Sequence, residues 1–121
     1  MRTLKVYCYD GCGTCRKALK FLEAHKIVAE ILPIRESPPS MVELKAMVAA
    51  YGGSWRKLFN TSGLDYKAMN LKERLAGMTQ AEALKLLRGN GRLVKRPFVI
   101  TRDSGWVGFD ESEWKRRLAE G

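Results

Sequence analysis

The stretch that decides the fold lies near the start of the chain and reads Val6-Tyr7-Cys8-Tyr9-Asp10-Gly11-Cys12-Gly13-Thr14-Cys15-Arg16-Lys17. Its first residues are β-branched and aromatic, as is typical of a strand, and Asp10-Gly11 is a turn signal. From Thr14 onwards, apolar residues recur at helical spacing, at Ala18, Leu19 and Leu22. The stretch therefore predicts a strand, a tight turn and an amphipathic helix that begins with two cysteines.

The spacing Cys12-x-x-Cys15 predicts a redox site. A sulfur at the N-terminus of a helix lies beside unpaired backbone N–H groups and the positive end of the helix dipole, which favour the thiolate. Arg16 and Lys17 add positive charge in the same turn. Cys15 is one turn along, near enough to resolve a mixed disulfide. We expect Cys12 to attack and Cys15 to resolve; the alternative is two incidental cysteines at a helix start.

Length and composition favour one soluble domain over residues 1–121. No apolar run approaches the ~20 residues of a membrane helix, so we expect no membrane contact. The first six residues lack the apolar block of a secretory signal, and three cysteines are an odd number for a disulfide framework. We therefore expect a cytoplasmic, reducing location, and a monomer.

The net charge is +9, from 22 basic and 13 acidic residues spread along the chain. Such a balance fits a solvated basic surface, the binding of small anions or a macromolecular partner. Direct nucleic-acid binding is not favoured, because the basic clusters are short and no aromatic platform accompanies them.

The rest of the chain continues the α/β pattern. Residues 28–32 form a second strand-like run that Pro33 stops, and residues 40–90 read as a helical block with two capping boxes, which begin at Ser40 and Thr79. Residues 93–94 and 98–101 then return to a strand pattern, and a turn at 103–105 leads to a strand at 106–109. Asp110 can cap a last helix.

Three further residue types bear on the site. Arg96 precedes Pro97, and a proline ahead of a strand often marks a tight or cis turn that would hold this arginine rigidly. The alternative is a surface arginine before an edge strand.

Cys8 is interpreted as a buried small apolar residue. We expect no metal, because only one Cys-x-x-Cys is present and His25, the single histidine, lies far along the helix.

Four segments together resemble the arsenate-reductase/Spx-like family of thioredoxin-fold proteins, almost end to end. They are residues 12–18, 58–66, 93–100 and 107–109. The resemblance implies a thioredoxin-like α/β fold, in which a βαβ unit and a ββα unit share a four-stranded mixed sheet, with a helical subdomain inserted at approximately 40–90. It also implies a cis-proline at Pro97 facing the cysteines, and an Arg96 guanidinium directed at the sulfur or at a bound oxyanion.

The family's arsenate reductases use one nucleophilic cysteine at the position of Cys12, three arginines around the oxyanion, and glutathione with glutaredoxin as reductant. Here Arg96 alone matches an arginine site; Asn60 and the Gly108-Phe109 region replace the other two, so arsenate is not the expected substrate. The resemblance places Thr14, Arg16, Asn60 and Pro97 around the substrate. It implies no bound cofactor and an external reductant, either glutathione with glutaredoxin or thioredoxin.

The Spx branch gives a different interpretation. Its members resemble this chain in the Cys-x-x-Cys motif, and they act as redox-sensing transcriptional regulators that bind RNA polymerase. The segment Asn60-Thr61-Ser62-Gly63 looks more like the reductase-like branch. We therefore expect a thiol-dependent oxidoreductase that works with a small thiol or a redox protein, and the RNA polymerase regulator stays the alternative.

Overall fold

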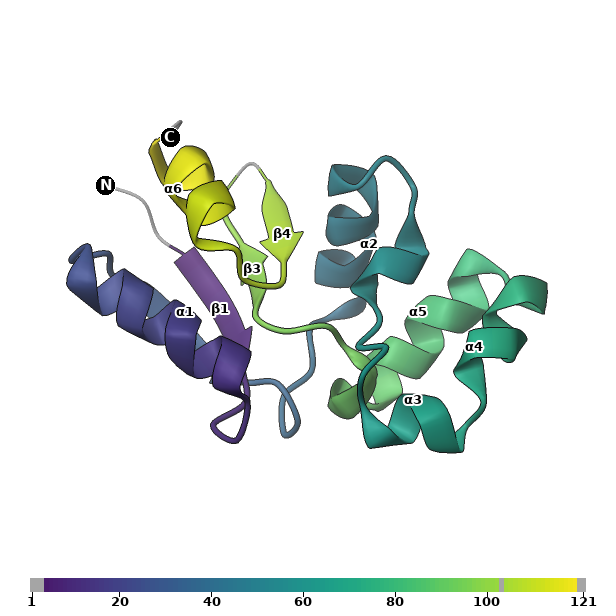
Figure 1. Ribbon diagram of the computed structural model, residues 1–121. Coiled ribbons are helices and arrows are strands. Elements are labelled where there is room, and N and C mark those ends of the chain that lie inside the picture. Colours follow the sequence, from purple (N-terminus) through teal and green to yellow (C-terminus); the bar gives the residue numbers. More distant parts are fainter. Residues whose placement is uncertain (1–3, 103, 120–121) are drawn as a thin grey trace.

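The computed structural model describes residues 4–102 and 104–119, and a four-stranded mixed sheet lies at its centre (Figure 1). The strands are β1 (Leu4–Cys8), β2 (Ala29–Pro33), β3 (Phe98–Ile100) and β4 (Gly105–Val107), in the spatial order β2-β1-β3-β4. β1 pairs with β2 in parallel and with β3 antiparallel, and β3 pairs with β4 antiparallel. The predicted βαβ and ββα units are both present.

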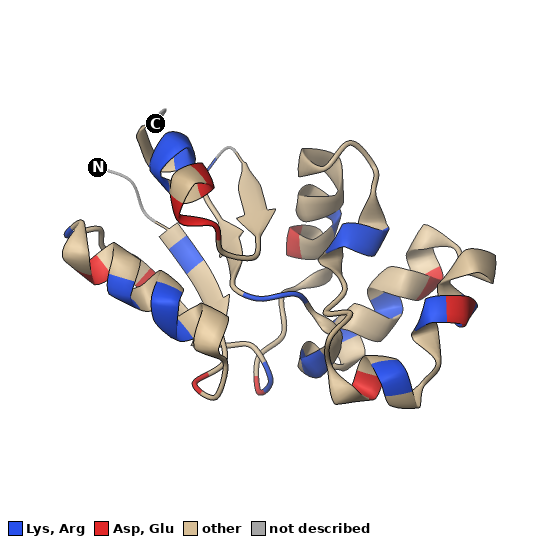
Figure 2. Ribbon diagram, viewed as in Figure 1, with Lys and Arg blue, Asp and Glu red and all other residues tan. Residues whose placement is uncertain are grey.

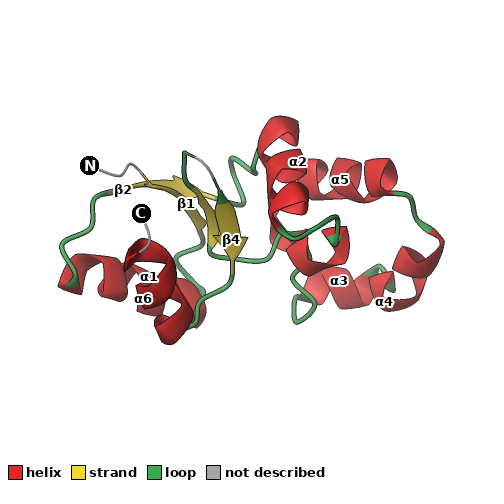
Figure 3. Cartoon of the chain, turned by 90° about the horizontal axis from the view of Figure 1, so that it is seen from above, coloured by secondary structure: helices red, strands yellow, loops and turns green. Residues whose placement is uncertain are grey.

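Helices cover both faces of this sheet (Figure 3). α1 (Gly13–Ala24) and α6 (Glu111–Ala119) pack on one face around the fully buried Trp114, and α2 (Met41–Ala50) packs on the other. The alternation of side chains along β1 explains this division: Val6 and Cys8 face α1, whereas Tyr7 faces the α2 side. The N-terminal strand is therefore buried on both sides.

The chain between β2 and β3 forms the predicted helical insertion. After α2 it contains η1 (Trp55–Leu58), α3 (Leu64–Ala68), α4 (Leu71–Arg74), η2 (Leu75–Gly77), α5 (Gln80–Gly89) and η3 (Gly91–Leu93). Both predicted capping boxes are confirmed: Ser40 exchanges hydrogen bonds with Glu43 at the start of α2, and Thr79 does so with Glu82 at the start of α5.

The prediction of a strand at residues 93–94 is wrong. Leu93 ends the 3-10 turn η3, and Val94 makes only an isolated bridge with Phe59. The physical reason is that the backbone on either side of Val94 pairs with Leu58 and Asn60 of the insertion, and Asn90 caps η3 by accepting the N–H of Arg92. The strands of the hairpin are also shorter than predicted, and Asp103, in its predicted turn, lies outside the described residues.

Lysine and arginine residues occur both in the part of the chain that forms the sheet with α1 and α6 and in the helical insertion (Figure 2). The excess charge is therefore spread, as predicted. Within residues 4–102 and 104–119, no helix is both long enough and apolar enough to cross a membrane.

Candidate functional site

The turn between β1 and α1 places Cys12 at the N-terminus of the helix. Cys12 is the N-cap residue, its N–H donates to the Tyr9 carbonyl at 3.0 Å, and its carbonyl accepts from the Arg16 N–H at 3.0 Å. No side chain caps the first turn of α1, so the free N–H groups there remain available to an anion. The Cys12 side chain is partly exposed, as the motif predicts for an attacking sulfur.

Cys15 lies one turn deeper and is only 1% exposed. The backbone N–H of Tyr9 donates to its sulfur at 3.4 Å. A hydrogen bond from the Cys8 thiol lowers the pKa of Cys15 to about 6, and this effect outweighs the burial that opposes ionisation. The same hydrogen bond and burial raise the pKa of Cys8. Donors from the end of β1 therefore favour the thiolate form of Cys15.

Cys8 is buried, as predicted, but its contact with Cys15 was missed. From the sequence, Cys8 was interpreted as an apolar side chain only. A signal was present, because alternation along the strand puts Cys8 on the same face as Val6, which is the face that α1 covers.

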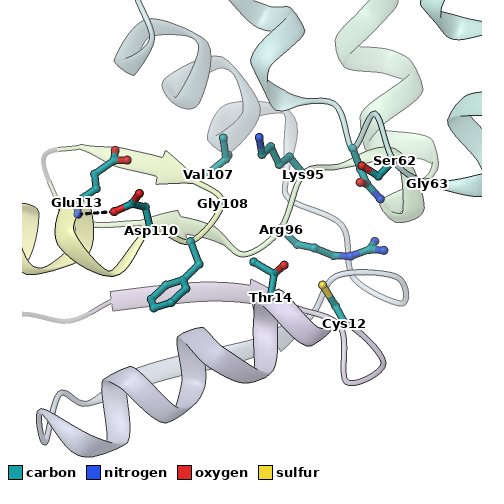
Figure 4. A pocket seen from close by; sticks show the side chains of 12 residues that line it. Cys12, Thr14, Ser62, Gly63, Lys95, Arg96, Val107, Gly108, Asp110 and Glu113 are labelled. Carbon is teal, nitrogen blue, oxygen red and sulfur yellow. Dashed lines mark hydrogen bonds between the residues drawn. The ribbon is translucent and has the colours of Figure 1, made fainter.

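Arg96 and Pro97 form the wall opposite the cysteines. The Arg96-Pro97 peptide bond is cis, as the family resemblance implied. Pro97 is buried and its carbonyl accepts the Gly108 N–H at 2.8 Å, which ties this segment to the end of β4. The Arg96 side chain extends above the Cys12 sulfur (Figure 4), and its Nη1 atom is buried without a hydrogen-bond partner. A charged donor is therefore available beside Cys12.

Between these walls lies a cavity of about 530 Å³ (Figure 4). Its lining residues are Cys12, Thr14, Asn60, Ser62, Gly63, Lys95, Arg96, Val107, Gly108, Phe109, Asp110 and Glu113. Four of the seven predicted site residues line it together, namely Cys12, Thr14, Asn60 and Arg96. They come from α1, from the helical insertion and from the segment before β3, so the cavity forms where the insertion meets the sheet.

The other three predicted site residues do not line this cavity. Cys15 lies buried beneath Cys12, and Pro97 lies buried behind Arg96. Arg16 is exposed on α1 and lies outside the lining set. The structure therefore does not place Arg16 against a substrate in the cavity.

Two backbone hydrogen bonds hold the insertion against the Arg96 segment. The Asn60 N–H donates to the Leu93 carbonyl at 2.7 Å, and the Lys95 N–H donates to the Leu58 carbonyl at 2.8 Å. They flank the bridge between Phe59 and Val94. This short ladder explains why Asn60, far from Cys12 in the sequence, reaches the same cavity.

Several lining residues were not predicted from the sequence, chiefly Lys95, Asp110 and Glu113. Lys95 was signalled by its position next to Arg96. Asp110 was interpreted only as a helix cap, which it is: its carboxylate accepts the Glu113 N–H at 3.0 Å. Nothing in the sequence indicated that the start of α6 faces the cavity.

Among the residues that the structure describes, no group of three His, Cys, Asp or Glu side chains could hold a metal ion. The site offers a partly exposed sulfur, a second sulfur behind it and a guanidinium opposite. This set can attack an electrophilic sulfur or an oxyanion and can close an internal disulfide.

The model of the ArsC family matches residues 7–117. The chain belongs to the ArsC family. It is 44% identical over 117 residues to the uncharacterized protein YusI of Bacillus subtilis, and the match covers 97% of this chain and 99% of YusI. It is also 29% identical over 115 residues to the global transcriptional regulator Spx of Enterococcus faecalis, covering 95% of this chain and 86% of Spx.

A solved structure supports the same assignment. The crystal structure of a possible arsenate reductase from Streptococcus mutans superimposes with a TM-score of 0.85 at 29% identity, covering 95% of this chain and 99% of that one. The predicted thioredoxin-like fold and family are therefore confirmed. Relatives in this ArsC family carry names of both branches, arsenate reductase and Spx.

Proposed function

We propose that this ArsC-family chain is a thiol–disulfide redox protein in which Cys12 attacks an oxidised substrate and Cys15 resolves the product. One observation carries the proposal: Cys12 shares a cavity with Arg96, while Cys15 lies buried in the same turn, where a hydrogen bond from Cys8 lowers its pKa. This arrangement separates a sulfur that substrate can reach from a buried sulfur that is in contact with the chain's own cysteines.

The proposed reaction has two exchange steps. The Cys12 thiolate attacks one sulfur of a disulfide, a new S–S bond forms, and the other sulfur leaves as a thiolate that takes the electron pair. The Cys15 thiolate then attacks the Cys12 sulfur, which closes the Cys12–Cys15 disulfide and releases the second thiolate. Two thiol groups of an external reductant return two electrons and are themselves oxidised to a disulfide; glutathione with glutaredoxin, or thioredoxin, is the class of reductant proposed.

Arsenate is not the proposed substrate. Among the described residues that line the cavity, Arg96 is the only arginine, and Asn60 and Gly108 lie where the resemblance implies the other two. A tetrahedral oxyanion is held best by several guanidinium groups, each of which can donate two parallel hydrogen bonds. One arginine favours a substrate of lower charge.

The test compares substrates on the wild-type chain. We expect reductant-dependent turnover with small mixed disulfides and at least about tenfold slower turnover with arsenate, because the missing charge-assisted hydrogen bonds are each worth that much. Consumption of NADPH through a coupled glutathione or thioredoxin system measures both. Absence of turnover with every disulfide would refute the proposal, and efficient arsenate turnover would refute the choice of substrate.

A second candidate function is a redox-sensing regulator that binds RNA polymerase. The observation that favours it is the similarity to Spx over 95% of the chain. In this function the Cys12–Cys15 disulfide would act as a switch without turnover. A pull-down of purified RNA polymerase on the immobilised chain, in its oxidised and its reduced form, separates the two functions. The regulator should bind the polymerase in one redox state more than in the other, whereas the enzyme needs no such binding.

The proposed resolving step should follow the ionisation of Cys15. Since the Cys15 pKa is lowered to about 6, we expect the step to slow as the pH falls below 6 and to level off above about 7. Reaction with 4,4′-dithiodipyridine measures the rate of the resolving step. The two exchange steps release thiopyridone in two phases, and the resolving step is the phase whose rate does not depend on the reagent concentration.

Two substitutions of Cys8, the hydrogen-bond donor to Cys15, are the controls for this pH profile. Cys8→Ala removes the thiol that stabilises the Cys15 thiolate, so the midpoint of the profile should move to higher pH. Cys8→Ser keeps an O–H donor and should stay closer to wild type. A midpoint that does not change in Cys8→Ala would show that Cys8 does not set the ionisation of Cys15.

A further inference from the structure

Cys8 is a buried thiol that takes part in neither exchange step of the proposed reaction. It is the last residue of β1, it is a free cysteine, and its side chain is 4% exposed. It does not belong to the described residues that line the cavity, so a substrate bound there does not reach its sulfur. A nucleophile in this position can react with the chain's own sulfurs and with little else.

Cys15 contacts both of the other cysteines. Its sulfur shares one side-chain hydrogen bond with Cys8 and another with Cys12. The backbone N–H of Tyr9 donates to the same sulfur at 3.4 Å, which places Cys15 against the peptide that joins Cys8 to Tyr9. Cys8 and Cys15 are also buried in one cluster on the α1 side of the sheet, and Cys12 packs against this cluster. The Cys15 sulfur therefore has two possible partners in disulfide exchange.

The aromatic ring of Tyr9 holds the end of β1 in place beside Cys15. The guanidinium carbon of Arg35 lies 3.5 Å from the ring centroid, and that of Arg96 lies 5.3 Å from it, so both make cation–π contacts. Arg35 belongs to the loop between β2 and α2, whereas Arg96 precedes β3. Because two other segments fix this ring, the neighbouring Cys8 is held against Cys15 by the fold and not by their hydrogen bond alone.

We propose that Cys8 is a third exchanging thiol, which attacks Cys15 once the Cys12–Cys15 disulfide has formed and so returns Cys12 to the cavity as a free thiol. This inference rests on the proposed function, because it needs that internal disulfide as its starting point. A bond forms between the sulfurs of Cys8 and Cys15, the Cys15–Cys12 bond breaks, and the Cys12 sulfur leaves with the electron pair. Cys8 gives up its thiol proton and Cys12 takes one up, so the step consumes no oxidant or reductant.

The charge on Cys15 sets the order of the steps. While Cys15 is a thiolate, the hydrogen bond that Cys8 donates to it and its negative charge both raise the pKa of Cys8, as burial also does. Cys8 therefore keeps its proton and does not attack. When Cys15 enters the disulfide it loses its charge, and the two causes that depend on this charge disappear. Cys8 then ionises more easily, at the point where a bond for it to attack is in contact with its sulfur.

The exchange separates the stored disulfide from the site of attack. Cys8 and Cys15 are both buried, whereas Cys12 is partly exposed and lines the cavity. A free Cys12 can attack a second oxidised substrate before an external reductant arrives. The same exchange in reverse returns the disulfide to Cys12, where the reductant can reach it.

The test locates the one thiol that remains free after the full-length wild-type chain has reacted with one equivalent of 4,4′-dithiodipyridine. Acid stops the exchange, because it removes the thiolate. The chain is then unfolded, its free thiol is labelled with N-ethylmaleimide, and its disulfide is reduced and labelled with iodoacetamide. Trypsin cleaves after Lys5 and Arg16 and leaves all three cysteines in one peptide, residues 6–16. Tandem mass spectrometry of this peptide shows which cysteine carries the maleimide.

We expect the maleimide on Cys12 in most molecules, which means that the disulfide joins Cys8 to Cys15. Maleimide on Cys8 alone, with the disulfide still between Cys12 and Cys15, would overturn the inference. This measurement needs no substitution, so a loss of stability in a variant does not affect it. Absence of any internal disulfide, with thiopyridine still attached to Cys12, would instead overturn the proposed function.

Two variants serve as controls for the labelling. Cys15→Ser lacks the central sulfur, so its mixed disulfide should stay on Cys12 and the maleimide should label Cys8. Cys8→Ser should keep the Cys12–Cys15 disulfide and carry no maleimide. With excess reagent, the wild type should release a third equivalent of thiopyridone more slowly than the first two, because the regenerated Cys12 reacts again. A third equivalent from Cys8→Ser as well would contradict the assignment to Cys8.

Discussion

The Cys12→Ser chain is expected to form mixed disulfides at least about a thousandfold more slowly than the wild type, because a serine hydroxyl does not ionise at neutral pH and cannot attack a disulfide. Cys15 does not replace it, since its sulfur is buried beneath the motif. Thiopyridone release from 4,4′-dithiodipyridine measures the loss. In the matched variant Cys15→Ser, one equivalent of thiopyridone should be released at a nearly normal rate, and the mixed disulfide of Cys12 should accumulate.

The contrast between the two variants decides the division of labour. Cys8→Ser is the control for replacing a cysteine of this region by serine. It should release two equivalents of thiopyridone, one from each exchange step. If Cys12→Ser instead forms a stable mixed disulfide on Cys15 at a normal rate, the roles of the two sulfurs are reversed. This outcome is a real test because the lowered pKa of Cys15 would favour attack by Cys15. The attack is assigned to Cys12 because its sulfur is partly exposed, whereas the Cys15 sulfur is buried.

The second large effect is expected at Gly91, where the helical insertion meets the sheet. Gly91 is buried, and a Cβ atom there would overlap the backbone carbonyl of Ile34, just after β2. Backbone cannot move aside as a flexible side chain can, so Gly91→Ala should lower the free energy of unfolding by about 2–4 kcal/mol. Urea denaturation followed by tryptophan fluorescence measures it.

Gly89 provides the matched control, two residues earlier in the same segment. It is the last residue of α5, and a Cβ atom there would meet nothing within 4 Å. Alanine favours the helix over glycine by up to about 1 kcal/mol, so Gly89→Ala should be neutral or stabilising. Equal destabilisation by both substitutions would mean that close packing at Gly91 does not hold the insertion on the sheet.

Local patterns predicted the secondary structure well where one segment contained all the needed information. Ser40 and Thr79 each start a helix because their partner is three residues away, and the pair forms without help from the rest of the chain. Leu93 and Val94 were predicted wrongly because the backbone here pairs with Leu58 and Asn60 of the insertion and not with a strand of the sheet. The pattern of apolar residues cannot say which distant segment a strand-like run will pair with.

The site was predicted in part for the same reason. Cys12 and Arg96 carry family motifs, and they do lie across one cavity, although their chemical roles stay predictions until the variants are measured. Arg35 and Glu113 carry no motif and reach the region through the folding of other segments. Their contribution depends on distances between elements that no local pattern encodes.

By itself the sequence determined a strand, a turn and a helix that begins with two cysteines one turn apart, because strand pattern, turn chemistry and helix capping all act within a few residues. Only the tertiary structure decided what surrounds those sulfurs. Cys8 contacts Cys15 because β1 runs under α1, and Arg35 and Arg96 meet at Tyr9 because the sheet brings the ends of β1, β2 and β3 together. Contacts of this kind form through long-range packing, which sets the environment of a reactive group.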